Sequence, residues 1–390
     1  MGMGNFKPSE IEFDLLKERA YNLRWATVPE GVIPLTAADP DFKIAPVIRD
    51  AIADYCRGGY FSYTPAEGLP QFTDSLHTFF RDRRSCVIPA NQILPVDSAA
   101  YGIFLICKTI LNKGDEAIIF DPVDFLFQYS IEHVGAKPVR FAIPAGSTNI
   151  DFSLIEKLIT TKTKMICLCN PLNPTGKVFT REELEIIGNI AVKHNILILS
   201  DEIWSDIVFK PNVFTSIASI SDDIAAHTLI VTGFSKSYGL AGLRIGVVAT
   251  VNQKLFQSIF ENSLHQSTIH GVNSIGQIAA TAALNSAQPW LDEFVIHLQS
   301  MRDLVTEKIN AIKGLQTIAP EGCYVSLIDI RSTGLSSEEF ARKMLQQAKV
   351  AVVPGLTQWF GPGAEGYVRI SFATTSAVLM EALNRIEENL

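Results

Sequence analysis

The sequence predicts an α/β fold: a large domain with a mostly parallel sheet flanked by helices, and a smaller α+β domain beside it. Short apolar, β-rich runs alternate with helical patterns through the middle of the chain, which is typical of a sheet with helices on both faces. After about residue 285 this alternation stops, and a long helical stretch begins.

Local patterns predict the elements of the large domain. The expected strands are 116–120, 138–141, 164–169, 196–200, 228–232 and 245–250. A helix over 98–111 follows Asp97, a good N-cap residue. Thr180 and Glu183 form a capping box in front of a helix over 181–194.

The remaining elements build the smaller domain. A helix over 290–312 leads into a strand over 324–330, and Ser336 with Glu339 forms a second capping box. A strand over 367–372 and a terminal helix close the chain. The first 45 residues are rich in loops, so we expect them to pack on this part. The predicted domains are 46–284 and, together, 1–45 with 285–390.

Composition excludes several classes of protein. Of 390 residues, 47% are hydrophobic and 19% are charged, which is enough apolar material for a large core. The net charge of −8 argues against a general nucleic-acid binder, because that affinity comes from Lys and Arg on phosphates. No apolar run approaches the ~18 residues of a membrane helix. Met1–Lys7 matches neither a signal peptide nor a myristoylation signal, so we expect a cytoplasmic protein.

The cysteines and histidines predict no metal site. No CxxC pair and no HExxH spacing occurs. We expect buried, inert thiols at all six cysteines: Cys56, Cys86, Cys107, Cys167, Cys169 and Cys323.

Two charged residues lie beyond the carboxyl ends of predicted strands, where ligands bind in open α/β sheets. Asp201 follows the strand 196–200. A partly desolvated carboxylate there needs a cation or a strong donor, and a protonated heteroaromatic nitrogen would serve; the alternative is a helix N-cap. Lys236 follows the strand 228–232 in a loop of small residues. A confined lysine loses proton affinity and suits Schiff-base formation; the alternative is a surface lysine.

Three further segments offer partners for a phosphate and a ring oxygen. Ser235 and Arg244 flank the Lys236 loop, and a forked Arg suits a phosphate. Ser98 begins a helix whose free N–H groups form a phosphate seat, although any helix start qualifies. Asn173 lies in a turn after the strand 164–169 and can aim its amide at a ring oxygen. An ordinary Asn-Pro turn explains it equally well.

These segments, in this order, resemble the fold type I pyridoxal-phosphate enzymes, specifically the class I/II aminotransferases. The strongest motifs are Asn173–Gly176, Ser200–Glu202, Ser235–Lys236 with Arg244, and Tyr367–Ala373. The resemblance runs from about Leu35 to the C-terminus. It implies a seven-stranded-type sheet, pyridoxal 5'-phosphate (PLP) as cofactor, and amino-group transfer between an L-amino acid and a 2-oxo acid.

The resemblance also implies roles for single residues. Lys236 is similar to the lysine that holds the cofactor as an internal aldimine and then shuttles the Cα proton. Asp201 resembles the partner of the pyridinium nitrogen. Asn173 resembles the donor to the phenolic oxygen and also lines the substrate site. Arg369 is similar to the arginine that clamps the substrate α-carboxylate, and Ala38 stands at a substrate-lining position where glycine is usual.

The implied phosphate site draws on two subunits. Ser98, Ala99, Ser235 and Arg244 match the phosphate-binding set of one chain. Tyr63 resembles the tyrosine that reaches the phosphate of the neighbouring subunit. We therefore expect a homodimer with shared active sites.

The chain departs from the family pattern at several cofactor positions. Trp204 stands where a tyrosine usually donates to the phenolic oxygen; an indole N–H still donates. Asp124 stands where an aromatic usually stacks on the ring, and Phe125 or Tyr101 is the alternative for that role. Gly233 replaces a common phosphate-binding serine. These departures motivate one alternative function, a non-catalytic amino-acid sensor of the same fold.

A second alternative is a C–S β-lyase. Asp201–Phe209, Gly58–Tyr63 and Gln288–Asp292 resemble the cystathionine β-lyase-type enzymes, which expel a thiol from Cβ. The Lys236–Arg244 stretch and the Arg369 segment fit an aminotransferase better. No motif fixes the substrate side chain.

Overall fold

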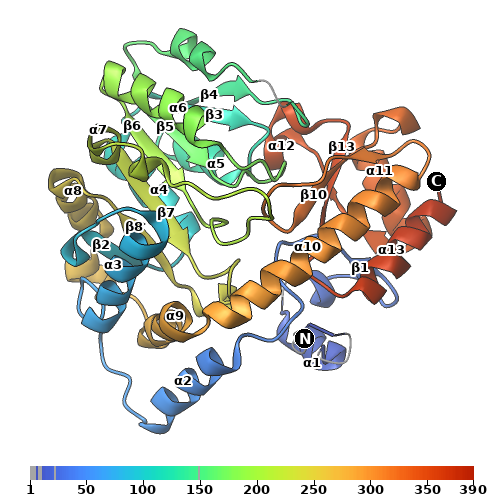
Figure 1. Cartoon of the computed structure of the whole chain (residues 1–390), viewed down its shortest axis with the longest axis horizontal. Helices are drawn as coiled ribbons and strands as arrows, with labels where there is room; N and C mark the ends of the chain where they lie inside the picture. The colour runs from blue at the N-terminus through green and yellow to red at the C-terminus, as the bar shows by residue number, and fades with distance from the viewer. Residues whose placement is uncertain (1–5, 8–10, 22, 148–149) are drawn as a thin grey trace.

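The largest part of the computed structural model is a seven-stranded sheet of order β2-β8-β7-β6-β5-β3-β4 (Figure 1). Its strands are β2 (Ile93–Val96), β3 (Glu116–Asp121), β4 (Lys137–Ala142), β5 (Thr163–Cys169), β6 (Leu197–Asp201), β7 (Thr228–Gly233) and β8 (Gly246–Ala249). The strands from β4 to β7 pair in parallel, whereas β8 pairs antiparallel with both β7 and β2. The predicted α/β class with a mostly parallel sheet is confirmed.

The structure describes residues 6–7, 11–21, 23–147 and 150–390. Most of the stretch that argued against a targeting signal, residues 1–5, therefore lies outside the described residues. None of the described helices combines the length and the apolarity that crossing a bilayer requires.

Helices cover the sheet and join the two halves of the chain. They are α1 (Phe13–Arg19), α2 (Pro46–Arg57), α3 (Pro70–Arg84), α4 (Ala99–Ile110), α5 (Leu126–His133), α6 (Arg181–His194), α7 (Asp222–Ala226), α8 (Gln253–Ser263), α9 (Ser274–Ser286), α10 (Gln288–Ala311), α11 (Ser337–Lys343), α12 (Thr357–Phe360) and α13 (Ser376–Glu388). Both predicted capping boxes are confirmed, in front of α6 and α11. The N-cap of α4 is Ser98, not Asp97, because the Ser98 hydroxyl accepts the Tyr101 N–H at 3.0 Å.

Two smaller sheets lie in the rest of the chain. One has the order β12-β13-β10-β9, formed by β9 (Gln316–Thr317), β10 (Val325–Asp329), β12 (Val353–Pro354) and β13 (Tyr367–Ser371). In the other, β1 (Ile33–Pro34) pairs in parallel with β11 (Val350–Ala351). This pairing ties residues 33–34 of the N-terminal segment to the C-terminal part. Figure 1 shows the long helix α10 running across the molecule towards that part. The domain boundaries at 46 and 284 stay a prediction.

The inner strands of the large sheet are buried on both faces. Every residue of β7 and β8 is buried, as are the last five residues of β5, which is the pattern of a parallel sheet covered by helices. Because β5, β6 and β7 are parallel, their carboxyl ends meet at one edge. The residues that follow these ends, including Asn173, Asp201 and Lys236, are thereby brought to the same edge of the sheet.

The cysteines correct one expectation. Cys56 is exposed on α2, so it is not a buried thiol. The other five are buried and unpaired, and burial raises the pKa of the thiol of Cys86 and of Cys107 to about 12. The predicted burial is confirmed for those five, and a raised pKa disfavours the reactive thiolate form.

Candidate active site

Lys236 lies in the loop after β7, and its amine is enclosed by protein groups. Its Nζ donates a hydrogen bond to the Ala38 carbonyl at 2.7 Å and lies 5.3 Å from the Trp204 ring centroid. Burial lowers the pKa of the Lys236 amine, and the nearby carboxylates of Asp39 and Asp124 oppose that shift. The amine therefore gives up its proton more readily than a surface lysine does. Lys236 is half-buried and its amine is hydrogen-bonded, so it is not a freely exposed surface lysine.

Asp201 ends β6 as a buried acid. Its Oδ1 accepts the Ile203 N–H at 3.1 Å, and no helix begins in the turn that follows, so the helix N-cap alternative is wrong. Burial raises the pKa of the Asp201 carboxyl to about 7, and the charges of Asp124 and Glu202 add to this, while the Ile203 N–H and Lys236 oppose it. Such a group calls for a donor or cation that the surrounding protein only partly supplies.

Arg369, Asn173 and Asp124 form a hydrogen-bonded chain beside Lys236. Arg369 Nη1 donates to Asn173 Oδ1 at 3.1 Å, and Asn173 Nδ2 donates to Asp124 Oδ2 at 2.9 Å. Arg369 Nη2 donates to the Thr36 carbonyl at 3.1 Å, while its buried Nε has no protein partner. The guanidinium is thus fixed in place by two hydrogen bonds, and its Nε–H is without a protein partner, which suits an anionic ligand.

Two aromatic side chains and one carbonyl complete the arrangement. Tyr324 donates its hydroxyl to the Ala38 carbonyl at 3.1 Å, the same oxygen that Lys236 uses. Trp204 packs edge-on against Tyr324, with ring centroids 4.6 Å apart. Together these groups form the active-site cluster: Ala38, Asp39, Asp124, Asn173, Asp201, Trp204, Lys236, Tyr324 and Arg369.

Sequence reasoning missed two members of the active-site cluster and a contact. Asp39 and Tyr324 carry no motif that marks them, although Asp39 adjoins Ala38 and Tyr324 begins a predicted strand. The contact between Lys236 and Ala38 involves a backbone oxygen, so no side-chain pattern announces it. Phe125 and Tyr101 are the two alternatives for stacking on the cofactor ring. Phe125 packs edge-on against Trp359, with ring centroids 5.5 Å apart, and the ring centroids of Tyr101 and Phe104 lie 6.5 Å apart.

None of the four predicted phosphate-binding residues takes part in the hydrogen bonds described above. Ser98 and Ala99 start α4, and β8 approaches this helix end closely at Gly246, where a Cβ would lie 2.4 Å from the Ala99 nitrogen. Ser235 is half-buried next to Lys236. Arg244 is exposed, and its Nη1 donates to the Ala241 carbonyl at 3.3 Å. Their phosphate-binding roles stay predictions.

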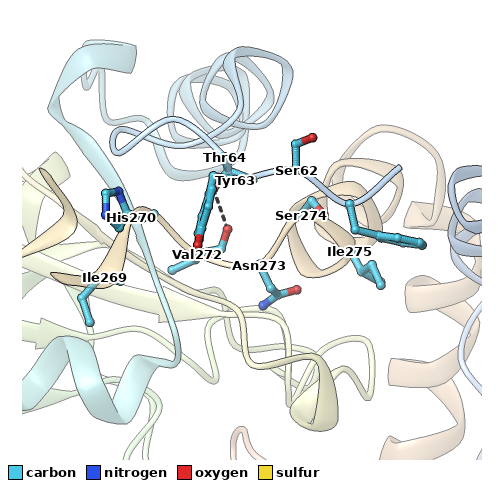
Figure 2. Close-up of a pocket in the computed structure, with 11 residues that line it drawn as sticks. Ser62, Tyr63, Thr64, Ile269, His270, Val272, Asn273, Ser274 and Ile275 are labelled. Atoms are coloured by element: carbon cyan, nitrogen blue, oxygen red, sulfur yellow. Dashed lines mark hydrogen bonds between the residues drawn. The ribbon is translucent and has the colours of Figure 1, made fainter. Parts of the chain in front are cut away.

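Tyr63 lies outside the active-site cluster of its own chain. It is 88% exposed, and its ring centroid lies 5.3 Å from that of His270. Residues 61–64 and 269–275 line a cavity of about 770 Å³ (Figure 2) that shares no lining residue with the active-site cluster. The Thr64 hydroxyl joins the two segments by donating to the Val272 carbonyl at 2.7 Å.

The fold and the active-site cluster define a fold type I pyridoxal-phosphate-dependent enzyme. The chain belongs to the class I and II aminotransferase family, whose model matches residues 30–386.

Individual relatives agree with this family. The chain is 34% identical to an aspartate aminotransferase of Bacillus sp. (strain YM-2), with 91% of each chain covered. It is 27% identical to the cystathionine beta-lyase PatB of Bacillus subtilis, covering 97% of this chain and 100% of that one. Among solved structures, the aromatic aminotransferase of Pyrococcus horikoshii OT3 matches with a TM-score of 0.86 and 28% identity, over 96% of this chain and 98% of that chain.

Proposed function

We propose that Lys236, Asp201 and Arg369 form the catalytic centre of a PLP-dependent aminotransferase that moves an amino group between an L-amino acid and a 2-oxo acid. One observation carries the proposal: a buried lysine amine with lowered pKa shares its surroundings with a buried acid whose pKa is raised to about 7. Shifts of this kind, with stated charge partners, are typical of functional sites.

The residues present fit the cofactor. The Asp201 carboxylate is buried and accepts one backbone N–H, so a protonated ring nitrogen would supply the missing positive partner. The start of α4 offers free N–H groups, and Gly246 keeps the space beside them free of a side chain. Ser98, Ala99, Ser235 and Arg244 would hold the phosphate. Asn173 and Trp204 would donate to the phenolic oxygen.

The chemistry divides between the cofactor and the chain. When bound, PLP supplies an aldehyde for amine exchange and a conjugated ring that accepts the electron pair of Cα. Lys236 Nζ removes and returns the proton at the substrate Cα, a role that burial favours because it lowers the pKa of this amine. Arg369 binds the substrate α-carboxylate through its fork, and Asn173 orients that fork.

The active-site cluster draws its residues from both predicted domains. Ala38 and Arg369 belong to 1–45 and 285–390, whereas Asn173, Asp201 and Lys236 belong to 46–284. We propose this division as the true one, with the substrate bound where the two parts meet. The five buried, unpaired thiols support the cytoplasmic location that we propose, because disulfides are rare in that reducing compartment.

The β-lyase alternative is separated from transamination by one experiment. The holoenzyme is incubated with cystathionine and no oxo acid. A transaminase converts its cofactor to the amine form in a single stoichiometric turnover and then stops. Continuous release of pyruvate and a free thiol would instead establish β-elimination, as in the relative named cystathionine beta-lyase. Absence of turnover with a full amino-acid panel and oxo acids would favour the sensor.

We expect a homodimer whose contact includes the segment 60–63. Tyr60, Phe61 and Tyr63 are 85%, 57% and 88% exposed, and exposed aromatic groups in one patch mark an interaction surface. Light scattering should give a mass near twice the chain's 42.9 kDa. A fully active monomer would contradict this.

A Tyr63→Phe variant tests the hydroxyl alone. A hydrogen bond to a charged group contributes about 1.5–3 kcal/mol, so cofactor affinity should fall roughly tenfold to a hundredfold while the dimer mass stays unchanged. Tyr60→Phe is the matched control, and it should bind the cofactor like the parent. Equal cofactor affinity in both variants would remove Tyr63 from the phosphate site.

A further inference from the structure

Asp124 places a carboxylate next to Asn173 and Arg369, the residues assigned to substrate binding. The family usually has an aromatic ring at this position. The Asp124 backbone N–H donates to the Asn173 carbonyl at 3.1 Å. Its Oδ2 accepts Asn173 Nδ2 at 2.9 Å, and its Oδ1 accepts the Leu126 N–H at 3.3 Å. Both oxygens are therefore held in fixed positions next to the group that binds the α-carboxylate.

The amide of Asn173 separates the two opposite charges. Arg369 only donates hydrogen bonds and an ionised Asp124 only accepts them, so the amide has one possible orientation, with Oδ1 towards Arg369 and Nδ2 towards Asp124. Asp124 forms no ion pair within the described part of the chain. The guanidinium of Arg369 donates instead to Asn173 Oδ1 and to the Thr36 carbonyl. Burial raises the pKa of the Asp124 carboxyl, while Arg369, the Leu126 N–H, Lys236 and Asn173 act in the opposite direction and favour its charged form. No ion pair neutralises that charge, so it can act on a ligand.

The charges around Lys236 are predominantly negative. Asp39, Asp124 and Asp201 all act on its amine, and Arg369 is the cation that acts against them. Arg24 forms an ion pair with the Asp41 carboxylate at 3.1 Å and donates a hydrogen bond to the backbone carbonyl of Asp39. With Asp201 assigned to the ring nitrogen, a substrate with a second carboxylate would thus meet the like charges of Asp39 and Asp124.

We infer that Asp124 determines substrate specificity: it selects against amino acids with a side-chain carboxylate and favours side chains that donate hydrogen bonds. Specificity of this kind arises from a repulsive element built against the wrong ligand. The inference rests on the proposed function, because it assumes that Arg369 takes the α-carboxylate. It predicts that this chain differs in substrate preference from its relative named aspartate aminotransferase.

The test compares two ligands of equal shape that do not react. Succinate carries a second carboxylate, and succinamate carries an amide in its place. Calorimetry on the holoenzyme should show succinamate binding about tenfold to a hundredfold more tightly, as expected for like charges roughly 6–12 Å apart at an effective dielectric constant of ~20. In Asp124→Asn the two dissociation constants should come within about twofold. Damage to Arg369 positioning would weaken both ligands alike, so their ratio isolates the charge.

Controls make the outcome decisive. Glu185→Gln removes an exposed carboxylate on α6 and should keep the parent preference. Succinate binding as tightly as succinamate in the parent, or an unchanged preference in Asp124→Asn, overturns the inference. The ratio of kcat/KM for asparagine over aspartate should follow the same pattern. Turnover that fails with every amino acid would defeat the proposed function, whereas the binding ratio still decides the role of Asp124.

Discussion

A Lys236→Ala variant is expected to lose both the absorbance of the lysine-bound cofactor and turnover. The methyl group cannot form the covalent link, and no amine remains to carry the Cα proton. Loss of a positioned acid–base group alone lowers the rate by roughly 10²–10⁴-fold, so the combined loss should exceed this. Absorbance spectra and single-turnover rates with an amino acid in excess measure the two effects separately.

Two companion variants show whether the amine itself is responsible. Lys236→Arg keeps the positive charge but neither forms the link nor gives up its proton, so it should behave like the alanine variant. Lys254→Ala removes an exposed lysine on α8 and should retain the parent spectrum and rate. Thermal melts establish that each variant folds. A Lys236→Ala protein with the parent spectrum and rate would refute the assignment of the whole site.

The sheet was predictable because its strands are apolar runs that end in turn residues. The six strands predicted for the large domain all appear, with ends shifted by at most one residue. The short edge strand β2 was missed because Ile93–Val96 is only four residues long and contains Pro95. Its antiparallel pairing with β8 depends on a contact far along the chain, which no local pattern encodes.

The site was predictable where a side chain ends a strand. Asp201 ends β6 and Lys236 lies in the loop after β7, and parallel pairing brings those strand ends together. Groups that act through the backbone, or that come from the other half of the chain, do not stand at the end of a strand of the large sheet. This pattern therefore could not predict them. The carbonyl of Ala38 receives two donors, from Lys236 and Tyr324, and neither contact follows from residue type. Asp124 stood out only as a departure, and its hydrogen bond to Asn173 needed the structure.

An Asp201→Asn variant is expected to retain the attached cofactor and to lose most of its turnover. Asparagine can still accept the Ile203 N–H, but it carries no charge to keep a ring nitrogen protonated. Removing one electrostatic group of this kind lowers kcat by roughly 10²–10³-fold. Single-turnover kinetics with the covalent cofactor monitored by absorbance should therefore show a normal spectrum for attachment and a slow reaction. A parent-like rate would exclude Asp201 as the partner of the ring.

The same substitution should stabilise the apoprotein, because a buried carboxylate is costly without its cation. The pKa of Asp201 is about 7 in the folded chain and takes its ordinary value of 3.8 when unfolded. Between these values the folded state holds a proton that the unfolded state has released, so stability falls as the pH rises and levels off above pH 7. At about 1.4 kcal/mol per pKa unit, the full difference is about 4 kcal/mol at most.

Denaturant unfolding of the two apoproteins at pH 4 and pH 8 measures this difference. Asp201→Asn should match the parent near pH 4 and exceed it at pH 8. Glu202→Gln is the matched control, since burial also raises the pKa of that neighbouring acid to about 7. It should gain stability over the same pH range yet keep its turnover, because Glu202 bonds to Ser200 and Ser216 rather than to the active-site cluster. Loss of turnover in both variants would mean that a buried charge at this strand end is structural, whereas loss in Asp201→Asn alone assigns the catalytic role to that one carboxylate.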